Sequence, residues 1–256
     1  MAKDLLKGYV DVQTHNGITT IEFFHPQSNS LPHRMLEDLA NEIHAYGRNA
    51  ETKVIILRSA GEKAFCAGAS FDELTKIETA QKGFEFFSGF ADVINAMRKC
   101  PKFIIGRIHG KCVGGGVGLA AAMDYAIATE AAEIKLSELS IGIGPFVVGP
   151  AVQRKIGLSC FTQLAIDATM WRNADWARRK GLFAELHTTI EGMDESVRRL
   201  ANQLARSNPE AMAELKKSFW EGTENWDELL SRRAEISGKL VLNPSSKESI
   251  KSLIKK

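Results

Sequence analysis

A glycine-rich stretch at residues 110–122 constrains this chain more than any other feature, because it lies between two segments with the pattern of β-strands. Residues 103–108 are short and rich in β-branched side chains, and residues 125–129 have a similar pattern. The end of the stretch, rich in leucine and alanine, is helical by composition. The glycines are therefore expected where a loop enters a helix.

Free backbone N–H groups at such a helix start can bind a ligand. They lack intrahelical partners and carry the positive end of the helix dipole, so a loop without side chains can approach an anionic or carbonyl oxygen. The alternative is that the glycines only allow close helix packing. A nucleotide-phosphate loop fits less well, because Leu119 replaces the last glycine of the G-x-G-x-x-G pattern and no Gly-Lys-Ser/Thr follows.

The first third of the chain predicts a β-hairpin followed by a helix and a buried strand. Residues 9–14 and 18–24 have strand patterns on either side of Asn16 and Gly17, a strong turn signal. Apolar residues recur at helical spacing over residues 33–49, and residues 53–58 are continuously apolar or β-branched. This order predicts a β-α-β arrangement.

A second strand-loop-helix junction follows at residues 59–70, which are punctuated by glycines. Ser70 begins a pattern typical of a helix N-cap, and the helix is expected to run to about residue 77. A longer helix is expected over residues 83–98, with an apolar stripe that includes Phe84, Phe87 and Phe90. This stripe is more typical of a packing surface than of a cofactor site.

Glu138 lies in an irregular turn between a short strand at residues 132–136 and a helix expected from residue 145 to about 156. It is a lone carboxylate among apolar residues. It is either an ordinary surface glutamate or a buried acid/base group.

Strand and helix patterns continue to about residue 188, after which the chain is almost entirely helical. Breaks are expected at residues 207–209 and 243–246. The predicted fold class is α/β, with an α/β core over residues 1–191 and a helical C-terminal region over residues 192–256.

Composition limits the partners that this chain is expected to have. A chain of 256 residues, 44% hydrophobic, can bury a sizeable core. Its 33 Lys and Arg against 31 Asp and Glu give a net charge of +2, so nucleic acid is not expected as a partner. No segment resembles a membrane span or a signal peptide, so a cytoplasmic location without membrane association is expected.

The cysteines and histidines have no ligand spacing. Four cysteines are scattered without a C-x-x-C pair, which predicts buried reduced thiols rather than a disulfide framework. The six histidines also form no cluster. No metal site and no separate cofactor are expected.

Together, the two glycine-rich junctions and the isolated glutamate form a chemically coherent set. Two backbone N–H groups from different loops could hold one carbonyl oxygen and stabilise the charge that develops on it. A nearby carboxylate could move a proton. This combination is typical of enolate or oxyanion chemistry.

Three stretches, residues 64–74, 110–120 and 123–128, resemble the signatures of the crotonase, or enoyl-CoA hydratase/isomerase, superfamily. Shorter similarities at residues 26–31, 177–182 and 208–211 extend the resemblance over nearly the whole chain. It implies a spiral of β-β-α units with a helical trimerisation region, and assembly into a homotrimer or a dimer of trimers. It also implies a CoA thioester as substrate, with coenzyme A entering as part of that substrate.

Matching the motifs residue by residue assigns the expected site. The oxyanion hole would consist of the N–H groups of Ala69 and Gly115, and Glu138 would be the catalytic acid/base. Further substrate-binding positions implied by the resemblance are Ala67, Gly68, Leu74, Gly114, Gly118 and Ile143. The acyl pocket is expected to be lined by the helix after Ser70, the stripe with Phe84, Phe87 and Phe90, and residues 143–148.

One departure from the family pattern leaves the reaction open. The best-known hydratases of the family use two glutamates, and the position of the first one is Gly118 here. The spacing from Glu138 to Gly142 matches the second. A single base is sufficient for moving a double bond, as in the family's isomerases, while the motif context also resembles methylglutaconyl-CoA-type hydratases. Hydration is placed first, isomerisation second, and a non-catalytic or RNA-binding scaffold remains a third reading.

Overall fold

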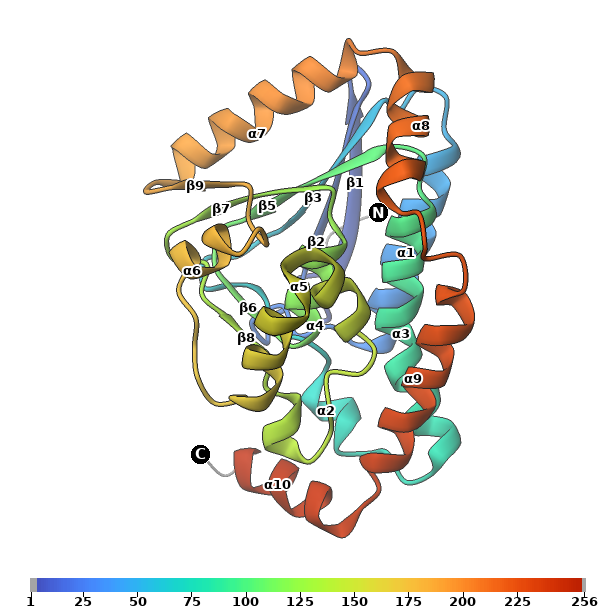
Figure 1. The fold of residues 1–256 in the computed structure, drawn as a ribbon, viewed down its shortest axis with the longest axis vertical. Helices are drawn as coiled ribbons and strands as arrows, with labels where there is room; N and C mark the ends of the chain where they lie inside the picture. Colours follow the sequence, from blue (N-terminus) through green and yellow to red (C-terminus); the bar gives the residue numbers. More distant parts are fainter. Residues whose placement is uncertain (1–3, 255–256) are drawn as a thin grey trace.

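The structure, a computed structural model that describes residues 4–254, contains two β-sheets that lie among helices (Figure 1). The larger sheet has the strand order β1-β2-β3-β5-β7-β9, and only its first pair is antiparallel. Its strands are β1 (Tyr9–His15), β2 (Ile18–Phe24), β3 (Val54–Ser59), β5 (Phe103–Ile108), β7 (Tyr125–Thr129) and β9 (Glu185–His187). The smaller sheet is parallel and consists of β4 (Ala64–Cys66), β6 (Lys111–Val113) and β8 (Ile134–Lys135). The predicted α/β class is confirmed.

The predicted N-terminal hairpin is present in the expected register. Tyr9 lies opposite Phe24 and His15 lies opposite Ile18, so the turn contains only Asn16 and Gly17. Both turn residues have positive φ, 50° and 80°, which Asn and Gly tolerate best.

Three helices stand side by side along one flank: α1 (His33–Arg48), α3 (Ala80–Lys99) and α9 (Trp226–Leu240) (Figure 1). Two glycines set the distance between α3 and α9. A Cβ atom added to Gly83 would lie 2.6 Å from the Gly238 carbonyl oxygen, and one added to Gly238 would lie 2.6 Å from the Phe84 nitrogen. The two backbones are therefore in direct contact at this crossing.

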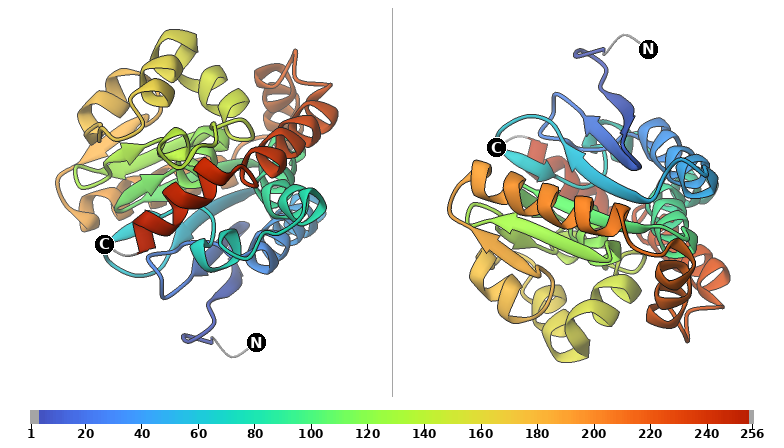
Figure 2. Two further views of the ribbon diagram at one scale, coloured as in Figure 1. Left: turned by 90° about the horizontal axis from the view of Figure 1, so that it is seen from below. Right: turned by 90° about the horizontal axis from the view of Figure 1, so that it is seen from above.

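Helix α7 (Ile190–Ala205) crosses the strands of the larger sheet on the face away from the smaller sheet (Figure 2, right). Met193 and Val197 pack there against Val54, Ile105 and Ile127, all of which are nearly or fully buried. The first helix after the core thus contributes to covering the sheet.

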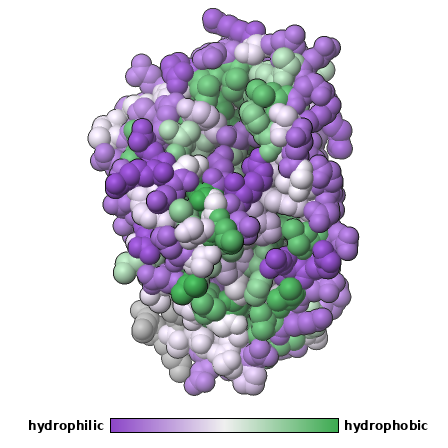
Figure 3. All heavy atoms as spheres, viewed as in Figure 1, coloured by the Kyte–Doolittle hydropathy of each residue, from purple (hydrophilic) through white to green (hydrophobic). Residues whose placement is uncertain are grey.

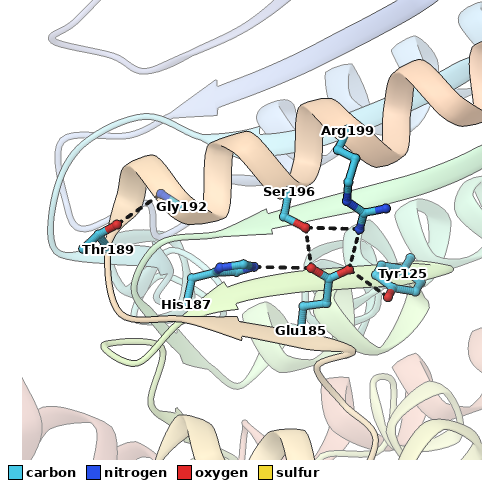
Figure 4. Close-up of polar contacts among 7 residues, drawn as sticks. All are labelled: Tyr125, Glu185, His187, Thr189, Gly192, Ser196 and Arg199. Atoms are coloured by element: carbon cyan, nitrogen blue, oxygen red, sulfur yellow. Dashed lines mark hydrogen bonds and ion pairs between the residues drawn. The ribbon is translucent and has the colours of Figure 1, made fainter.

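A polar cluster fastens α7 to the edge strand β9 (Figure 4). The Glu185 carboxylate accepts hydrogen bonds from the hydroxyls of Tyr125 (2.9 Å) and Ser196, and from the Arg199 guanidinium (3.0 Å). Nε2 of His187 lies 3.3 Å from Oε2 of Glu185, the oxygen that also accepts from Ser196. Burial opposes ionisation of this carboxyl, but the four partners together hold the pKa of Glu185 below its ordinary value.

Helix α8 (Pro209–Phe219) is joined to the core by a buried ion pair. The Lys216 ammonium lies 2.8 Å from Oδ2 of Asp124 and donates to the Lys102 carbonyl at 2.7 Å. Both side chains are at most 6% exposed. Asp124 also accepts from the Ile104 N–H, so the buried charges are well supplied with partners.

Two predicted helices differ from the observed ones. The helix capped by Ser70 is a single turn, α2 (Phe71–Leu74), and ends before residue 77. The helix expected from residue 145 begins instead at Gly149 and continues past residue 156 to Ile166. Gly157, with φ of 80°, interrupts it, and Pro145 belongs to the preceding turn.

The remaining helices are α4 (Gly115–Ala122), α5 (Gly149–Ile166), α6 (Ala174–Arg179), α10 (Pro244–Ile254) and the 3₁₀ helix η1 (Glu138–Ile141). None of the helices within residues 4–254 is both long and apolar enough to cross a membrane. On the face seen in Figure 3, hydrophobic residues gather in separate patches among largely hydrophilic ones.

Candidate active site

The first loop of the candidate site follows strand β4. The Leu31 N–H donates to the Gly68 carbonyl at 2.7 Å, and the Ser70 N–H donates to the Leu31 carbonyl at 3.0 Å. These two bonds use the groups on either side of Ala69. Within residues 4–254, the Ala69 N–H itself has no acceptor and is available to a ligand.

The second loop joins β6 to α4. Gly115 is the first residue of α4, so its N–H is one of the groups that a helix start leaves unpaired. A Cβ atom added to Gly68 would lie 3.5 Å from the Gly115 nitrogen and 3.0 Å from the Val113 carbonyl oxygen. The two loops are therefore in contact, and Ala69 and Gly115 line the same cavity.

Each glycine of the triplet has its own steric reason. A Cβ atom on Gly115 would lie 2.2 Å from the Phe90 ring, and one on Gly116 would lie 2.3 Å from the Cys66 carbonyl oxygen. Gly114 has a positive φ of 52°, and its Cβ atom would lie 3.0 Å from Oε1 of Glu138. Close helix packing alone explains only Gly116, since the other two face groups that line the cavity.

Glu138 is the first residue of η1 and points its carboxyl group toward Gly114. The side chain is partly exposed to the cavity, while its Oε2 atom is buried and has no hydrogen-bond partner in the described part of the chain. Burial raises the pKa of Glu138 to about 7. The expected apolar surroundings hold for Leu136 and Ile141, which are 1% and 8% exposed, but Leu139 is 51% exposed and points to solvent.

These residues line one cavity that is partly open to solvent, and its unoccupied space counted out to the open mouth is about 650 Å³. Of the predicted positions, it brings together Ala67, Gly68, Ala69, Leu74, Gly114, Gly115, Glu138 and Ile143. Glu138 is the only ionisable side chain among its described lining residues.

Gly118 is the predicted position that the cavity does not include. A Cβ atom there would lie 2.5 Å from Cγ1 of Val148, so Val148 fills the space beside this glycine. A substrate-binding role for Gly118 stays a prediction. Its lack of a side chain lets α4 approach the start of α5.

The aromatic part of the lining also differs from expectation. Phe87 and Phe90 reach the cavity, but Phe84 does not, because it lies at the backbone contact between α3 and α9. Phe86 takes its place. Phe71 also lines the cavity, and it is the first residue of the helix after Ser70, which was expected to line the acyl pocket.

The thiols beside the two loops are poor nucleophiles. Cys66 and Cys112 lie opposite each other on β4 and β6, and both are free and fully buried. Burial raises the pKa of the Cys66 thiol to about 12. In residues 4–254, no three His, Cys, Asp or Glu side chains are grouped so that they could hold a metal ion.

This arrangement can bind a carbonyl oxygen and transfer a proton. Two unpaired N–H groups can receive a carbonyl oxygen, and a carboxyl group whose pKa lies near neutrality can give or take a proton in the same cavity. A thioester carbonyl is a suitable ligand, because it gains negative charge when the adjacent carbon loses a proton.

Several proteins of known name are similar to this chain in sequence. The chain is 30% identical over 200 residues to the human mitochondrial methylglutaconyl-CoA hydratase, a match that covers 77% of this chain but only 58% of that relative. It is 26% identical over 208 residues to a (7aS)-7a-methyl-1,5-dioxo-2,3,5,6,7,7a-hexahydro-1H-indene-carboxyl-CoA hydrolase of Mycobacterium tuberculosis, covering 79% of this chain and 80% of the relative. The relatives thus include both a hydratase and a hydrolase of CoA compounds.

The fold has close counterparts among solved structures. An enoyl-CoA hydratase from Bacillus halodurans superposes with a TM-score of 0.87 at 21% identity, over 95% of this chain and 99% of that one. The family model of the enoyl-CoA hydratase/isomerase family matches residues 13–255. The chain therefore belongs to the enoyl-CoA hydratase/isomerase family, within the crotonase superfamily.

Proposed function

We propose that this chain adds water to the double bond of a 2-enoyl-CoA, with Glu138 as the single catalytic acid/base. The observation that carries the proposal is one carboxyl group, with a pKa of about 7, in a cavity shared with the unpaired N–H groups of Ala69 and Gly115. The methylglutaconyl-CoA hydratase among the relatives supports hydration as the reaction.

In the proposed mechanism, the Ala69 and Gly115 N–H groups donate to the thioester carbonyl oxygen. Ionised Glu138 takes a proton from a water molecule, whose oxygen bonds to C3 while the π electrons of the C2–C3 bond move into the enolate. Glu138 then returns that proton to C2, and the carbonyl re-forms. A pKa near neutrality suits a group that must act first as base and then as acid.

Isomerisation of a 3-enoyl-CoA is the second candidate, and the filled space at Gly118 favours it. Glu138 would remove a proton from C2, the double bond would shift from C3–C4 to C2–C3, and C4 would receive the proton. This reaction needs no water and no second carboxylate. A side chain at position 118 would meet Val148, whose Cγ1 atom would lie 2.5 Å from its Cβ atom.

The acyl group is proposed to be apolar and uncharged. The cavity is lined mainly by aromatic and aliphatic side chains, and no Lys, Arg or His is among its described lining residues. A substrate with a second carboxylate on its acyl chain, as in methylglutaconyl-CoA, would bury that charge without a partner from this chain. The proposal requires no metal or separate cofactor.

The test is a panel with crotonyl-CoA, a 3-enoyl-CoA and a saturated acyl-CoA. Loss of enoyl absorbance reports hydration, its gain reports isomerisation, and release of free thiol reports hydrolysis. Glu138→Gln should lose about a hundred- to ten-thousand-fold in turnover while still binding acyl-CoA. Glu133→Gln is the control, because Glu133 pairs with Lys111 outside the cavity.

The outcomes of this panel distinguish the candidate functions. Isomerisation without hydration selects the second candidate, and thiol release alone selects a hydrolase. Binding of acyl-CoA with no turnover selects the scaffold. Full activity of Glu138→Gln would overturn the assignment of Glu138.

A further inference from the structure

The carboxyl group of Glu138 is not held by any other side chain among the described residues. Oε2 lacks a hydrogen-bond partner, and Oε1 faces Gly114, which has no side chain. A group without side-chain partners takes its position from its backbone. The placement of this carboxyl group therefore depends on how firmly the turn that carries it is fixed.

The turn is well bonded within itself. The Glu138 carbonyl accepts from the N–H groups of Gly142 and Ile143, and the Ser140 hydroxyl donates to the Ser137 carbonyl at 2.7 Å. Gly142 closes the turn in the left-handed region, with φ of 74°. These bonds give the turn its shape but do not fix it relative to the rest of the molecule.

One polar contact reaches this turn from another element in the described part of the chain. The hydroxyl of Ser246, in α10, donates to the Gly142 carbonyl at 3.0 Å, and Ser246 is 1% exposed. A Cβ atom on Gly142 would lie 2.4 Å from the Ser246 oxygen, so the glycine lets the serine approach. The two residues are 104 positions apart in the sequence.

Apolar contacts accompany this hydrogen bond. Ile250, one turn after Ser246 on α10, belongs to a buried cluster with Ile141, Ile143, Leu74 and Phe86, all of which line the cavity. In Figure 2 (left), α10 is seen running across the near side of the molecule in that view. Helix α10 thus packs behind the cavity wall as well as on the turn.

We propose that Ser246 is a positioning residue for the reaction: by holding the Gly142 carbonyl, it fixes the turn that carries Glu138 and keeps that carboxyl group facing the oxyanion hole. The inference rests on the proposed role of Glu138. It adds a residue of the last helix to the groups on which turnover depends.

Ser246→Ala tests the proposal. Its kcat should fall roughly tenfold, with KM for the acyl-CoA changed by less than about twofold, because the binding loops are untouched while the acid/base is displaced. The midpoint of the pH–rate profile should move down from about 7, because a loosened turn admits water to a carboxyl whose pKa is raised by burial. No other ionisable side chain lines the cavity in the described residues, so that midpoint reports Glu138.

Two further variants sharpen the test. Ser246→Cys retains the packing but is a poorer donor, so its kcat should lie between those of wild type and Ser246→Ala, even if the alanine variant is poorly folded. Ser252→Ala is the matched control, because this exposed serine of the same helix donates only to the Ser249 carbonyl. It should behave as wild type.

A titration of ¹³C-labelled glutamate followed by NMR separates failure of this inference from failure of the proposed function. The signal lost in Glu138→Gln identifies Glu138, and its midpoint can be compared in wild type and Ser246→Ala without any turnover. A wild type inactive on all acyl-CoA substrates overturns the proposed function, whereas the titration still tests Ser246. Unchanged kcat, pH profile and titration midpoint in Ser246→Ala and Ser246→Cys would overturn the positioning role.

Discussion

A Cβ atom added to Gly114 would lie 3.0 Å from Oε1 of Glu138, so the first glycine of the triplet and the carboxyl group share one confined space. Gly114→Ala should displace the carboxyl group and lower kcat at least tenfold, in addition to the cost of about 1–2 kcal/mol for alanine at a positive φ. Steady-state kinetics and thermal unfolding together measure both effects.

Gly222→Ala is the control for that prediction. Gly222 also has a positive φ, 78°, but a Cβ atom there would meet nothing within 4 Å. This variant should lose stability by a similar amount and retain its turnover. Equal kinetic losses in the two variants would show that backbone strain, and not the contact with Glu138, is responsible.

The pKa of Glu138 predicts two pH dependences. Because ionised Glu138 is the form that begins the reaction, kcat/KM should fall as pH decreases through about 7. Burial raises the folded-state pKa of Glu138 above the ordinary 4.5, so the folded chain holds this proton more tightly than the unfolded chain does. The free energy of unfolding should therefore decrease as pH rises from 4.5 to 7, by on the order of 3 kcal/mol. Glu138→Gln should remove that decrease, and unfolding at pH 5 and pH 8 measures it. A rate that is flat from pH 5 to pH 9 would contradict the assignment.

Because Val148 fills the space beside Gly118, a glutamate introduced at that position should not fit. Gly118→Glu should destabilise the chain by about 1–3 kcal/mol and not increase hydration, because its Cβ atom would lie 2.5 Å from Val148. The double variant Gly118→Glu with Val148→Gly removes both Val148 atoms that would lie within 3.0 Å of the new Cβ atom, so it should regain part of the lost stability. Higher hydration in the single variant at unchanged melting temperature would refute this reading.

Local patterns in the sequence predicted the parts of the fold that local interactions determine. The hairpin at Asn16 and Gly17, the helix cap at Ser70 and the lone carboxylate at Glu138 each depend on neighbouring residues. The occupant of the space beside Gly118 depends on how α4 meets the chain near Val148, which no periodicity shows.

The same limit explains the aromatic lining. A helical stripe through Phe84 predicts one face of α3, but the contact between Gly83 and Gly238 turns that position toward α9 and leaves Phe86 at the cavity. The contact of Ser246 with Gly142 joins residues 104 positions apart and has no local signature at all. Burial and long-range contacts, rather than residue type, decided these positions.

Because of the cluster around Glu185, we expect the free energy of unfolding to fall in acid (Figure 4). Its folded-state pKa is lowered, so its contribution is present above the ordinary pKa and is lost as pH falls through the folded value. Glu185→Gln should cost about 1–2 kcal/mol at pH 7, and the difference from wild type should vanish in strong acid. Urea unfolding at pH 7 and pH 3 measures this, with the exposed Glu214→Gln as control. An equal loss at both pH values would exclude the charge as its cause.

Assembly into trimers, or pairs of trimers, is predicted through the helical region after residue 191. Leu215 and Phe219, one turn apart on α8, are 48% and 46% exposed and offer apolar surface that a neighbouring subunit would bury. Sedimentation at micromolar concentration should give three or six times the 28.2 kDa chain mass. Leu215→Glu should weaken the assembly, whereas Leu6→Glu, at a residue that is 89% exposed near the N-terminus, should not. A wild-type monomer would contradict the prediction.

The contact between Ser246 and Gly142 also has a consequence for the order of events during synthesis. A ribosome adds about 5–20 residues per second, so the 104 residues that separate the two take roughly 5 to 20 seconds to follow. During that interval the nascent chain can complete both glycine loops and the turn with Glu138, yet it lacks the helix that fastens the turn. We therefore expect the growing polypeptide to bind acyl-CoA before it can turn it over efficiently, and full turnover to begin only once α10 has been made.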